Sequence, residues 1–368
     1  MKHAACITLA SLSLAASHIA HAESGVKIYG TLDIFIGKIQ ASGDKSKNAA
    51  DGSGMTTSYF GISGKEDLGN GTKAIFTLET FYNTDLGTIG RFPGDGFLGR
   101  NSYAGLQGDA GTLTLGRHST PYFVSMLLFN PLGASEVFSP MFLHTYTGSN
   151  PGLVNLIGFD TAWNNSVMYQ SPDFNGLSFS AIYATHEVPG HPGKNSIGGN
   201  VLYFNGPFAA TFAAQRVTFP GGLAAGTAFP DDPADIPYPG SIYADLTALD
   251  DQLAYLAGLS YDLKVVKLFG EYAGTKNDFT HSGTQRSRTA QLGASVSQGR
   301  GEVQLSWART WQGSFAPQGI IRVHRDTATL AYDYPLSKRT DVYVAGSYDK
   351  VSTQSKGTTI GLGIRHNF

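Results

Sequence analysis

Histidine, serine and acidic residues are the side chains that could support catalysis or metal binding in this chain, and none falls in a recognised arrangement. His186 and His191 flank Pro189 and Gly190, which is a loop spacing that builds no metal-binding face on a helix. The acidic run at 230–235 could hold Ca²⁺ loosely, although a solvated loop is the simpler interpretation. The sequence contains no H-E-x-x-H, no phosphate-binding glycine loop and no G-x-S-x-G. We therefore expect no enzymatic activity, no cofactor and no metal site.

Five charged residues suggest a role in ion passage, because they lie on the polar side of segments that alternate between apolar and polar residues. These residues are Lys27, Asp33, Glu79, Lys267 and Glu271. Charges that line a narrow aqueous passage decide which ions pass through it. We expect the five to line a pore, and the alternative is that they are paired wall charges without a role in transport.

The elements that carry these charges have the period of β-strands. From Thr358 to Phe368, Ile360, Leu362 and Ile364 alternate with Thr359, Gly361, Gly363 and Arg365. The same alternation recurs in the segments around 26–36, 73–79, 252–261, 266–272 and 302–307. One apolar and one polar face per strand is what a transmembrane β-barrel requires.

A soluble β-sandwich also alternates, so alternation alone does not decide between the two folds. Three features favour the barrel. Aromatic residues such as Tyr261, Tyr272 and Phe368 stand near strand ends, where aromatic girdles lie. Short turns alternate with long loops, and the polar face carries charges and small residues instead of a second apolar layer. No segment after the first 22 residues has 18 uninterrupted apolar residues, which excludes transmembrane helices.

The connections predict the number of strands. Glycine, asparagine, aspartate and proline mark short turns near 66–71, 108–111, 172–176, 205–207, 261–263, 298–301 and 335–338. Longer segments lie at about 39–55, 84–99, 118–164, 187–197, 218–249, 276–286, 313–323 and 351–356. Seven turns and eight loops join sixteen strands. We predict an all-β fold, a 16-stranded antiparallel barrel closed between its first and last strands, which is wide enough for an aqueous channel.

The first 22 residues are predicted to be a secretory signal peptide. Lys2 gives a basic start, a short apolar run follows, and Ala20-His21-Ala22 is a cleavage site before Glu23. The only cysteine, Cys6, would leave with this segment, so the mature barrel at 23–368 must fold without disulfides. With 15% charged residues and a net charge of −2, the chain has no feature of a nucleic-acid-binding protein.

Several motifs, in order along the chain, resemble those of Gram-negative general-diffusion porins, most of all the neisserial and β-proteobacterial type. They are VKIYGTLD at 26–33, YFGISGKEDLGNG at 59–71, GRNSYAGL at 99–106, GTLTLGR at 111–117, NSVMYQSP at 165–172 and the terminal Phe368. The resemblance covers essentially the whole mature chain. It implies a homotrimer in the outer membrane, with short periplasmic turns, long extracellular loops and a third loop folded into the lumen.

The segment 118–164 occupies the place of that third loop, so we expect it to form the constriction. Its run from Tyr122 to Phe129 is too apolar for a solvated loop and makes sense if it is buried against the barrel wall. In the porin family, arginines of the wall face carboxylates of the loop. Arg100 matches one such arginine, and Glu136 matches the loop glutamate. From strand parity we expect Arg100 to point inward and Tyr103 outward.

Two departures from the family pattern affect the same constriction. Tyr59 stands where a wall arginine is common, and Met168 or Gln170 stands near the position of another. We therefore expect a less polarised constriction.

The resemblance implies passive diffusion of ions and small hydrophilic solutes, with the outer-membrane lipids, lipopolysaccharide and the barrel assembly machinery as partners and no nucleic acid. In that family the terminal aromatic residue, here Phe368, is the assembly signal. The alternatives are a substrate-specific channel or a surface adhesin barrel, and, in a third class, an outer-membrane hydrolase. A specific channel would saturate with its solute, and a hydrolase would need a Ser-His pair that the sequence does not reveal.

Overall fold

The computed structural model describes residues 25–91, 95–146, 161–187, 195–219, 249–279, 283–316 and 319–368, with side chains at 249 and 314–321 left aside. The predicted signal peptide, the acidic run at 230–235 and His191 lie outside these residues. Cleavage after Ala22 therefore stays a prediction.

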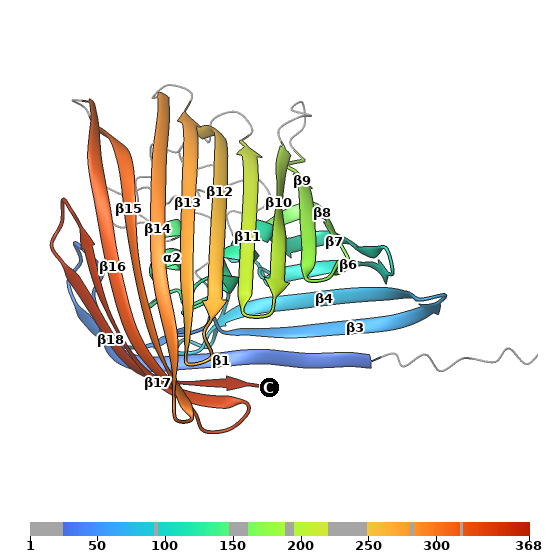
Figure 1. Cartoon of the computed structure of the whole chain (residues 1–368), viewed down its shortest axis with the longest axis horizontal. Coiled ribbons are helices and arrows are strands. Elements are labelled where there is room, and N and C mark those ends of the chain that lie inside the picture. Colours follow the sequence, from blue (N-terminus) through green and yellow to red (C-terminus); the bar gives the residue numbers. More distant parts are fainter. Residues whose placement is uncertain are drawn as a thin grey trace, which may run out of the picture.

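The chain folds into one antiparallel sheet that closes on itself (Figure 1). Sixteen strands form the barrel, as predicted, and β1 pairs with β18 to close it. The barrel strands are β1 (Gly25–Ile39), β3 (Tyr59–Gly69), β4 (Thr72–Asn83), β6 (Asn101–Gly108), β7 (Gly111–Ser119), β8 (Ala162–Gln170), β9 (Leu177–Thr185), β10 (Asn195–Asn205), β11 (Phe208–Thr218), β12 (Leu249–Asp262), β13 (Val266–Phe279), β14 (Gly283–Gln298), β15 (Gly301–Ala316), β16 (Gly319–Pro335), β17 (Thr340–Val351) and β18 (Gly357–Asn367).

Two short strands lie in connections rather than in the barrel wall. β2 (Lys47–Gly52) pairs with the second half of β1, and β5 (Thr88–Ile89) pairs with the end of β4. The first half of β1, from Gly25 to Thr31, pairs instead with β3. As a result, the segment from Ser53 to Ser58 between β2 and β3 is free to enter the lumen.

The seven short turns fall where the sequence predicted them, but two of the predicted loops are wrong in length. β13 and β14 continue to Phe279 and from Gly283, and β15 and β16 continue to Ala316 and from Gly319. The predicted loops at 276–286 and 313–323 are therefore mostly strand. These strand ends carry the charged residues Lys276, Asp278, Arg286 and Arg322 on the outward face, so their composition resembles that of a loop.

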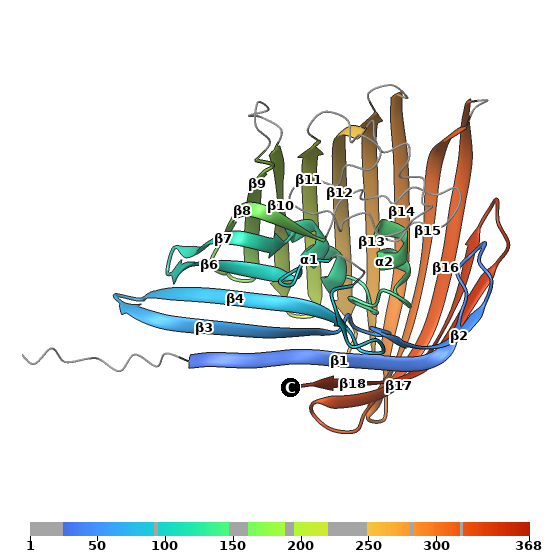
Figure 2. The same cartoon turned by 180° about the vertical axis from the view of Figure 1, so that it is seen from behind.

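The outward face of the barrel is apolar, with exposed side chains such as Leu113, Leu115, Leu259, Leu292 and Leu330. Two helices, α1 (Pro121–Leu128) and α2 (Pro140–Tyr146), lie within the curve of the sheet (Figure 2). In the part of the chain that the structure describes, no helix is long and apolar enough to cross a membrane. The same residues contain no group of three or more histidine, cysteine or acidic side chains that could hold a metal ion.

Candidate functional site: the lumen and the loop folded into it

The connection from β7 to β8 begins with helix α1. Thr120 caps this helix, because its hydroxyl accepts a hydrogen bond from the backbone N–H of Phe123 at 3.1 Å, and Pro121 follows at the first helical position. Tyr122 and Met126 are buried against Ala213 of β11 and other small or apolar residues of the inner wall. The apolar run that the sequence singled out is therefore a helix packed against the inside of the barrel.

Glycines of the inner wall allow the loop to lie close to the strands after α1. A Cβ on Gly258 of β12 would stand 2.9 Å from the Cβ of Phe129, and one on Gly293 of β14 would stand 2.6 Å from Cδ of Pro131. Both distances are shorter than carbon–carbon van der Waals contact. The loop can therefore lie directly against the wall from β10 to β14, because glycines instead of larger residues stand at these contacts.

Helix α2 fixes the returning part of the loop on β15 and β16. His144 is buried, and its two ring nitrogens each lie 2.8 Å from a threonine hydroxyl, Thr310 on β15 and Thr327 on β16. Burial lowers the pKa of His144 well below its ordinary value, and the nearby Arg325 guanidinium adds to this effect. A neutral imidazole has one donor and one acceptor, which suits two hydroxyl partners. Arg325 also donates to the backbone carbonyl of Leu143 at 2.9 Å.

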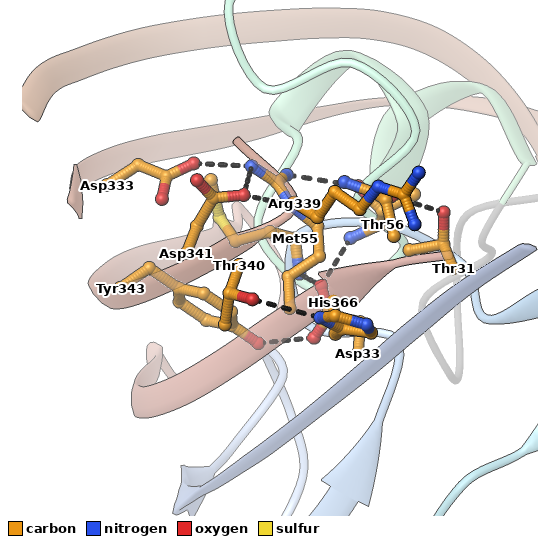
Figure 3. Close-up of polar contacts among 12 residues, drawn as sticks. Thr31, Asp33, Met55, Thr56, Asp333, Arg339, Thr340, Asp341, Tyr343 and His366 are labelled. Carbon is orange, nitrogen blue, oxygen red and sulfur yellow. Dashed lines mark hydrogen bonds and ion pairs between the residues drawn. The ribbon is translucent and has the colours of Figure 1, made fainter. Parts of the chain in front are cut away.

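Asp33 holds the segment Ser53–Ser58, which we call the inner segment, against the wall of the barrel. Its carboxylate accepts hydrogen bonds from the backbone N–H groups of Gly54 at 3.1 Å and of Met55 and Thr56 at 2.9 Å. The hydroxyl of Tyr343 on β17 donates to the same carboxylate at 2.6 Å (Figure 3). Asp33 itself is fully buried. One wall carboxylate therefore orders the backbone of a connecting segment.

The inner segment in turn contacts the loop between α1 and α2. The Ser135 hydroxyl donates to the carbonyl of Gly54 at 2.5 Å, and the Thr57 hydroxyl lies 3.3 Å from both the Ala134 carbonyl and a carboxylate oxygen of Glu136. Met55 packs in one buried cluster with Leu132 and Phe138 of the loop and Phe35 and Tyr343 of the wall. We refer to residues 132–138 as the loop tip. The loop tip therefore lies between the inner segment and the wall.

Arg100 lies on the wall in a cluster with Glu79, Tyr59, Tyr29 and Asn101, which we call the wall cluster. The Arg100 guanidinium forms an ion pair with Glu79 and lies 4.0 Å from the centre of the Tyr59 ring. The Tyr29 hydroxyl donates to Glu79 at 2.7 Å, and the Asn101 amide donates to it at 2.6 Å. A cation stacked on an aromatic ring and bound to a carboxylate has little freedom to move.

Arg100 reaches the inner wall as predicted, but strand parity is not the reason, and the predicted outward orientation of Tyr103 is wrong. Tyr103, expected to face outward, stacks on the buried His118 at a ring distance of 4.7 Å, and Asn101 reaches Glu79 on the same inner face. Arg100 precedes β6, which begins at Asn101, so strand alternation does not govern its side chain.

Glu136 and Arg100 both contact the short segment from Thr57 to Tyr59. Glu136, which is half-buried, is bound by Thr57, and Tyr59 beneath the guanidinium of Arg100 is only two residues further on. The other two predicted constriction residues do not join this cluster. Met168 is buried on the wall with Trp163 and Ile182, and Gln170 is exposed at the last position of β8, next to a turn.

The five predicted pore-lining charges fall into two groups. Lys27 is exposed, and Lys267 is half-buried with its ammonium 5.0 Å from the centre of the Phe269 ring. Asp33, Glu79 and Glu271 are on the inner wall but buried, with 0%, 5% and 4% of their surface exposed. For these three, an open pore-lining position is not what the structure shows, because the inner segment, Arg100 and the loop cover them.

Glu271 is the least satisfied of these carboxylates. Within the described residues, neither of its carboxylate oxygens has a hydrogen-bond partner. Burial raises the pKa of the nearby Tyr122 in α1, and the charge of Glu271 raises it further.

Sequence reasoning missed the residues that hold the site together. The inner segment contains no charge and no motif, and Tyr29 and Asn101 were treated only as strand residues. Arg365 of β18 was also missed; it binds Asp333 at 2.6 Å, Asp341 at 3.2 Å and the Thr56 hydroxyl at 3.2 Å. The one available signal was parity, since Arg365 stands on the polar face of the last strand.

Comparisons with known proteins agree with the geometry. A family model described as Gram-negative porin matches residues 8–354. Outer membrane porin protein 32 of Delftia acidovorans is 30% identical, with 96% of this chain and 97% of the relative covered. Major outer membrane protein P.IB of Neisseria meningitidis serogroup B is 27% identical, with 98% and 99% covered. An anion-selective porin from Comamonas acidovorans has a similar structure, with a TM-score of 0.72, 26% identity, and 94% and 100% covered.

Proposed function

Because the chain belongs to the Gram-negative porin family, we propose that its selectivity is set where the loop tip meets the wall cluster. As a member of this family it is a general diffusion channel for small solutes across the outer membrane, and the family consists of channels rather than enzymes. The proposal concerns which solutes pass most easily. Arg100 on the wall and Glu136 on the loop tip are the charges placed to decide this.

We propose further that the constriction prefers anions weakly. The observation that carries this proposal is the unequal exposure of the ion pair, in which 28% of the Arg100 side chain is exposed against 6% of Glu79. The cationic partner therefore faces the water of the lumen, while the carboxylate is turned into the wall. The anion-selective porin from Comamonas acidovorans supports the same direction. Glu136 opposes this preference and keeps it small.

The reversal potential across a planar bilayer tests the proposed preference. With the purified channel between two KCl solutions of different concentration, we expect a potential of the sign that chloride permeation gives. Since exposed charges act within a Debye length of about 10 Å at 0.1 M salt, the preference should shrink as the salt concentration rises. A potential of the opposite sign at low salt would refute the proposed anion preference.

We propose that the channel assembles as a homotrimer. Exposed apolar side chains on neighbouring strands β6 and β7, Leu106, Leu113 and Leu115, provide a surface without charges for contact between copies. We expect light scattering in a mild detergent to give the mass of three chains, with dissociation only on heating. A monomer under those conditions would contradict the proposal.

Phe368 is proposed as the signal for assembly into the membrane. Its backbone exchanges two hydrogen bonds with Gly30 of β1, at 3.1 and 3.2 Å, and its side chain is 43% exposed. Deleting Phe368 removes contacts at the barrel seam, where its backbone and ring lie against Gly30, so the amount of assembled protein should fall while the channels that do form conduct normally. Heat-modifiable mobility on gels measures the assembled fraction, and an unchanged fraction would count against this role.

A further inference from the structure

Glu271 of β13 is a buried carboxylate whose negative charge the protein does not balance. Only 4% of its surface is exposed, and in the part of the chain that the structure describes neither of its oxygens has a hydrogen-bond partner. A buried charge is costly unless an opposite charge or a metal ion accompanies it. The nearest basic residue on the same face of β13, Lys267, is four residues away, about 13 Å at the usual strand rise. Glu271 therefore needs a positive charge that its own strand does not supply.

A third oxygen without a partner lies next to this carboxylate. Gln291 of β14 stands directly opposite Glu271 in the pairing of the two strands, and it is buried. Its amide nitrogen donates to the Ser306 hydroxyl at 3.2 Å, whereas its amide oxygen has no partner among the described residues. Side chains opposite each other on one face have Cβ atoms about 4.5–5.5 Å apart, so these three oxygens can reach one common ligand. Three acceptors without a donor favour a bound cation over an internal hydrogen bond.

The loop folded into the lumen covers both side chains. On β12, Gly258 stands opposite Glu271 and lies directly beneath Phe129 of the loop. On β14, Gly293 lies directly beneath Pro131 of the loop. Neither a phenylalanine nor a proline brings a positive charge. The loop therefore shields these oxygens from the lumen without neutralising them.

Further polar side chains continue from this site toward the loop end of β13 and β14. Thr275 and Ser287 stand opposite each other, and both hydroxyls are buried without a partner in the described ranges. The next opposite pair, Asn277 and Gln285, is joined by a hydrogen bond of 3.3 Å, and the Gln285 amide nitrogen has no acceptor among the same residues. We call these four residues the polar file. Buried polar groups of this kind are satisfied by ordered water, which provides a route for an ion to Glu271 behind the loop.

We propose that Glu271 and the amide oxygen of Gln291 bind one monovalent alkali cation, sodium or potassium, between the loop and the wall. A single carboxylate balances a single positive charge, whereas a divalent ion would leave a net charge in the buried site. Carboxylate and carbonyl oxygens are the ligands that such hard cations prefer, and water from the polar file completes the coordination. The ion binds only when the loop covers the site, so it stabilises the folded channel. The proposal does not depend on the selectivity of the lumen.

Anomalous X-ray diffraction from crystals of the purified channel grown in rubidium chloride would locate such an ion directly. We expect a rubidium peak within bonding distance of both the Glu271 carboxylate and the Gln291 amide oxygen. Glu271→Gln keeps the shape of the side chain and removes its charge, so the peak should disappear. Gln291→Met removes one ligand and should weaken the peak. Glu66→Gln removes an exposed carboxylate near the end of β3 and serves as the control, in which the peak should stay unchanged.

Thermal unfolding of the detergent-purified channel gives a second readout. Replacing N-methylglucamine chloride with sodium or potassium chloride at the same concentration should raise the unfolding temperature, because a ligand that binds only the folded state stabilises it. We expect a rise of about 2–4 °C for the original channel and for Glu66→Gln, and none for Glu271→Gln. Gln291→Met keeps the carboxylate and should show a smaller rise, which provides the comparison if Glu271→Gln does not assemble.

The absence of a rubidium peak in the original channel would overturn the proposal, because a proton or water alone would then accompany the carboxylate. A peak that persists in Glu271→Gln would also overturn it, since the carboxylate would then not be a ligand. So would an equal rise in unfolding temperature with and without the Glu271 carboxylate. The reversal potential of Glu271→Gln should equal that of the original channel, so a failure of this proposal is distinguishable from a failure of the selectivity proposal.

Discussion

Replacing Asp33 with alanine will release the loop tip and turn a steady channel into a noisy one. The substitution removes the acceptor for three backbone N–H groups of the inner segment and for the Tyr343 hydroxyl. Each hydrogen bond to a charged group contributes about 1.5–3 kcal/mol, and buried donors left unpaired are costly. The inner segment then no longer fixes Ser135 and Glu136. Single-channel recordings should show frequent current fluctuations and passage of larger solutes.

Two further variants make this result interpretable. Tyr343→Phe removes one of the four donors and should give a smaller increase in noise, which provides a readout if Asp33→Ala assembles poorly. Asp341→Asn changes a neighbouring wall carboxylate that binds Arg365 and not the inner segment, so its current should stay steady. A quiet Asp33→Ala channel with the original conductance would show that the inner segment does not position the loop tip.

Replacing Arg100 with alanine should shift selectivity strongly toward cations. The change removes an exposed positive charge and also leaves the Glu79 carboxylate without its ion pair, held only by Tyr29 and Asn101. One unit charge acting at about 4 Å through water contributes about 1 kcal/mol, which corresponds to a roughly fivefold change in a permeability ratio. The reversal potential in a KCl gradient measures this shift.

Companion variants should shift the reversal potential in the opposite direction, by a smaller amount, or not at all. Glu136→Gln and Tyr59→Arg should move the reversal potential toward anions, and Tyr59→Arg should also lower the conductance because the larger side chain narrows the lumen. Arg100→Ala combined with Glu79→Gln should shift less than Arg100→Ala alone, since no carboxylate is left unpaired. Lys264→Ala, at an exposed turn, serves as the control and should leave selectivity unchanged. Identical reversal potentials for all of these channels at low salt would place the wall cluster outside the constriction.

The strands and turns were predictable because they depend on local sequence. Alternation of apolar and polar residues and the turn residues at seven positions are properties of a few neighbouring residues, and they give the sixteen strands and the closing pair. The extensions of β13–β16 were missed because beyond the membrane neither face of a strand needs to be apolar. There the residues Lys276, Asp278, Arg286 and Arg322 resemble those of a loop.

The sequence could not predict whether the inward charged side chains are exposed to the lumen or covered, because this depends on contacts between distant parts of the chain. Parity places Asp33 and Glu79 inside, but only the inner segment and Arg100 determine that both carboxylates are covered. Asp33 and Tyr343 are 310 residues apart in sequence. Strand parity does not apply to Arg100, because this residue stands one position before β6. Its contacts with Glu79 and Tyr59 orient the side chain instead.

Chemical modification of a single cysteine in the wall cluster tests the central claim most directly. The only cysteine of the chain is Cys6, in the predicted signal peptide, so a cysteine introduced by Arg100→Cys is the one reactive thiol of the mature channel. A thiol reagent that adds a bulky charged group should reduce the single-channel conductance, with a positively charged reagent favouring anions and a negatively charged one favouring cations. Leu292→Cys, on the membrane face, should be insensitive to both reagents. If full modification at position 100 leaves conductance and reversal potential unchanged, the wall cluster does not line the constriction and the account is wrong.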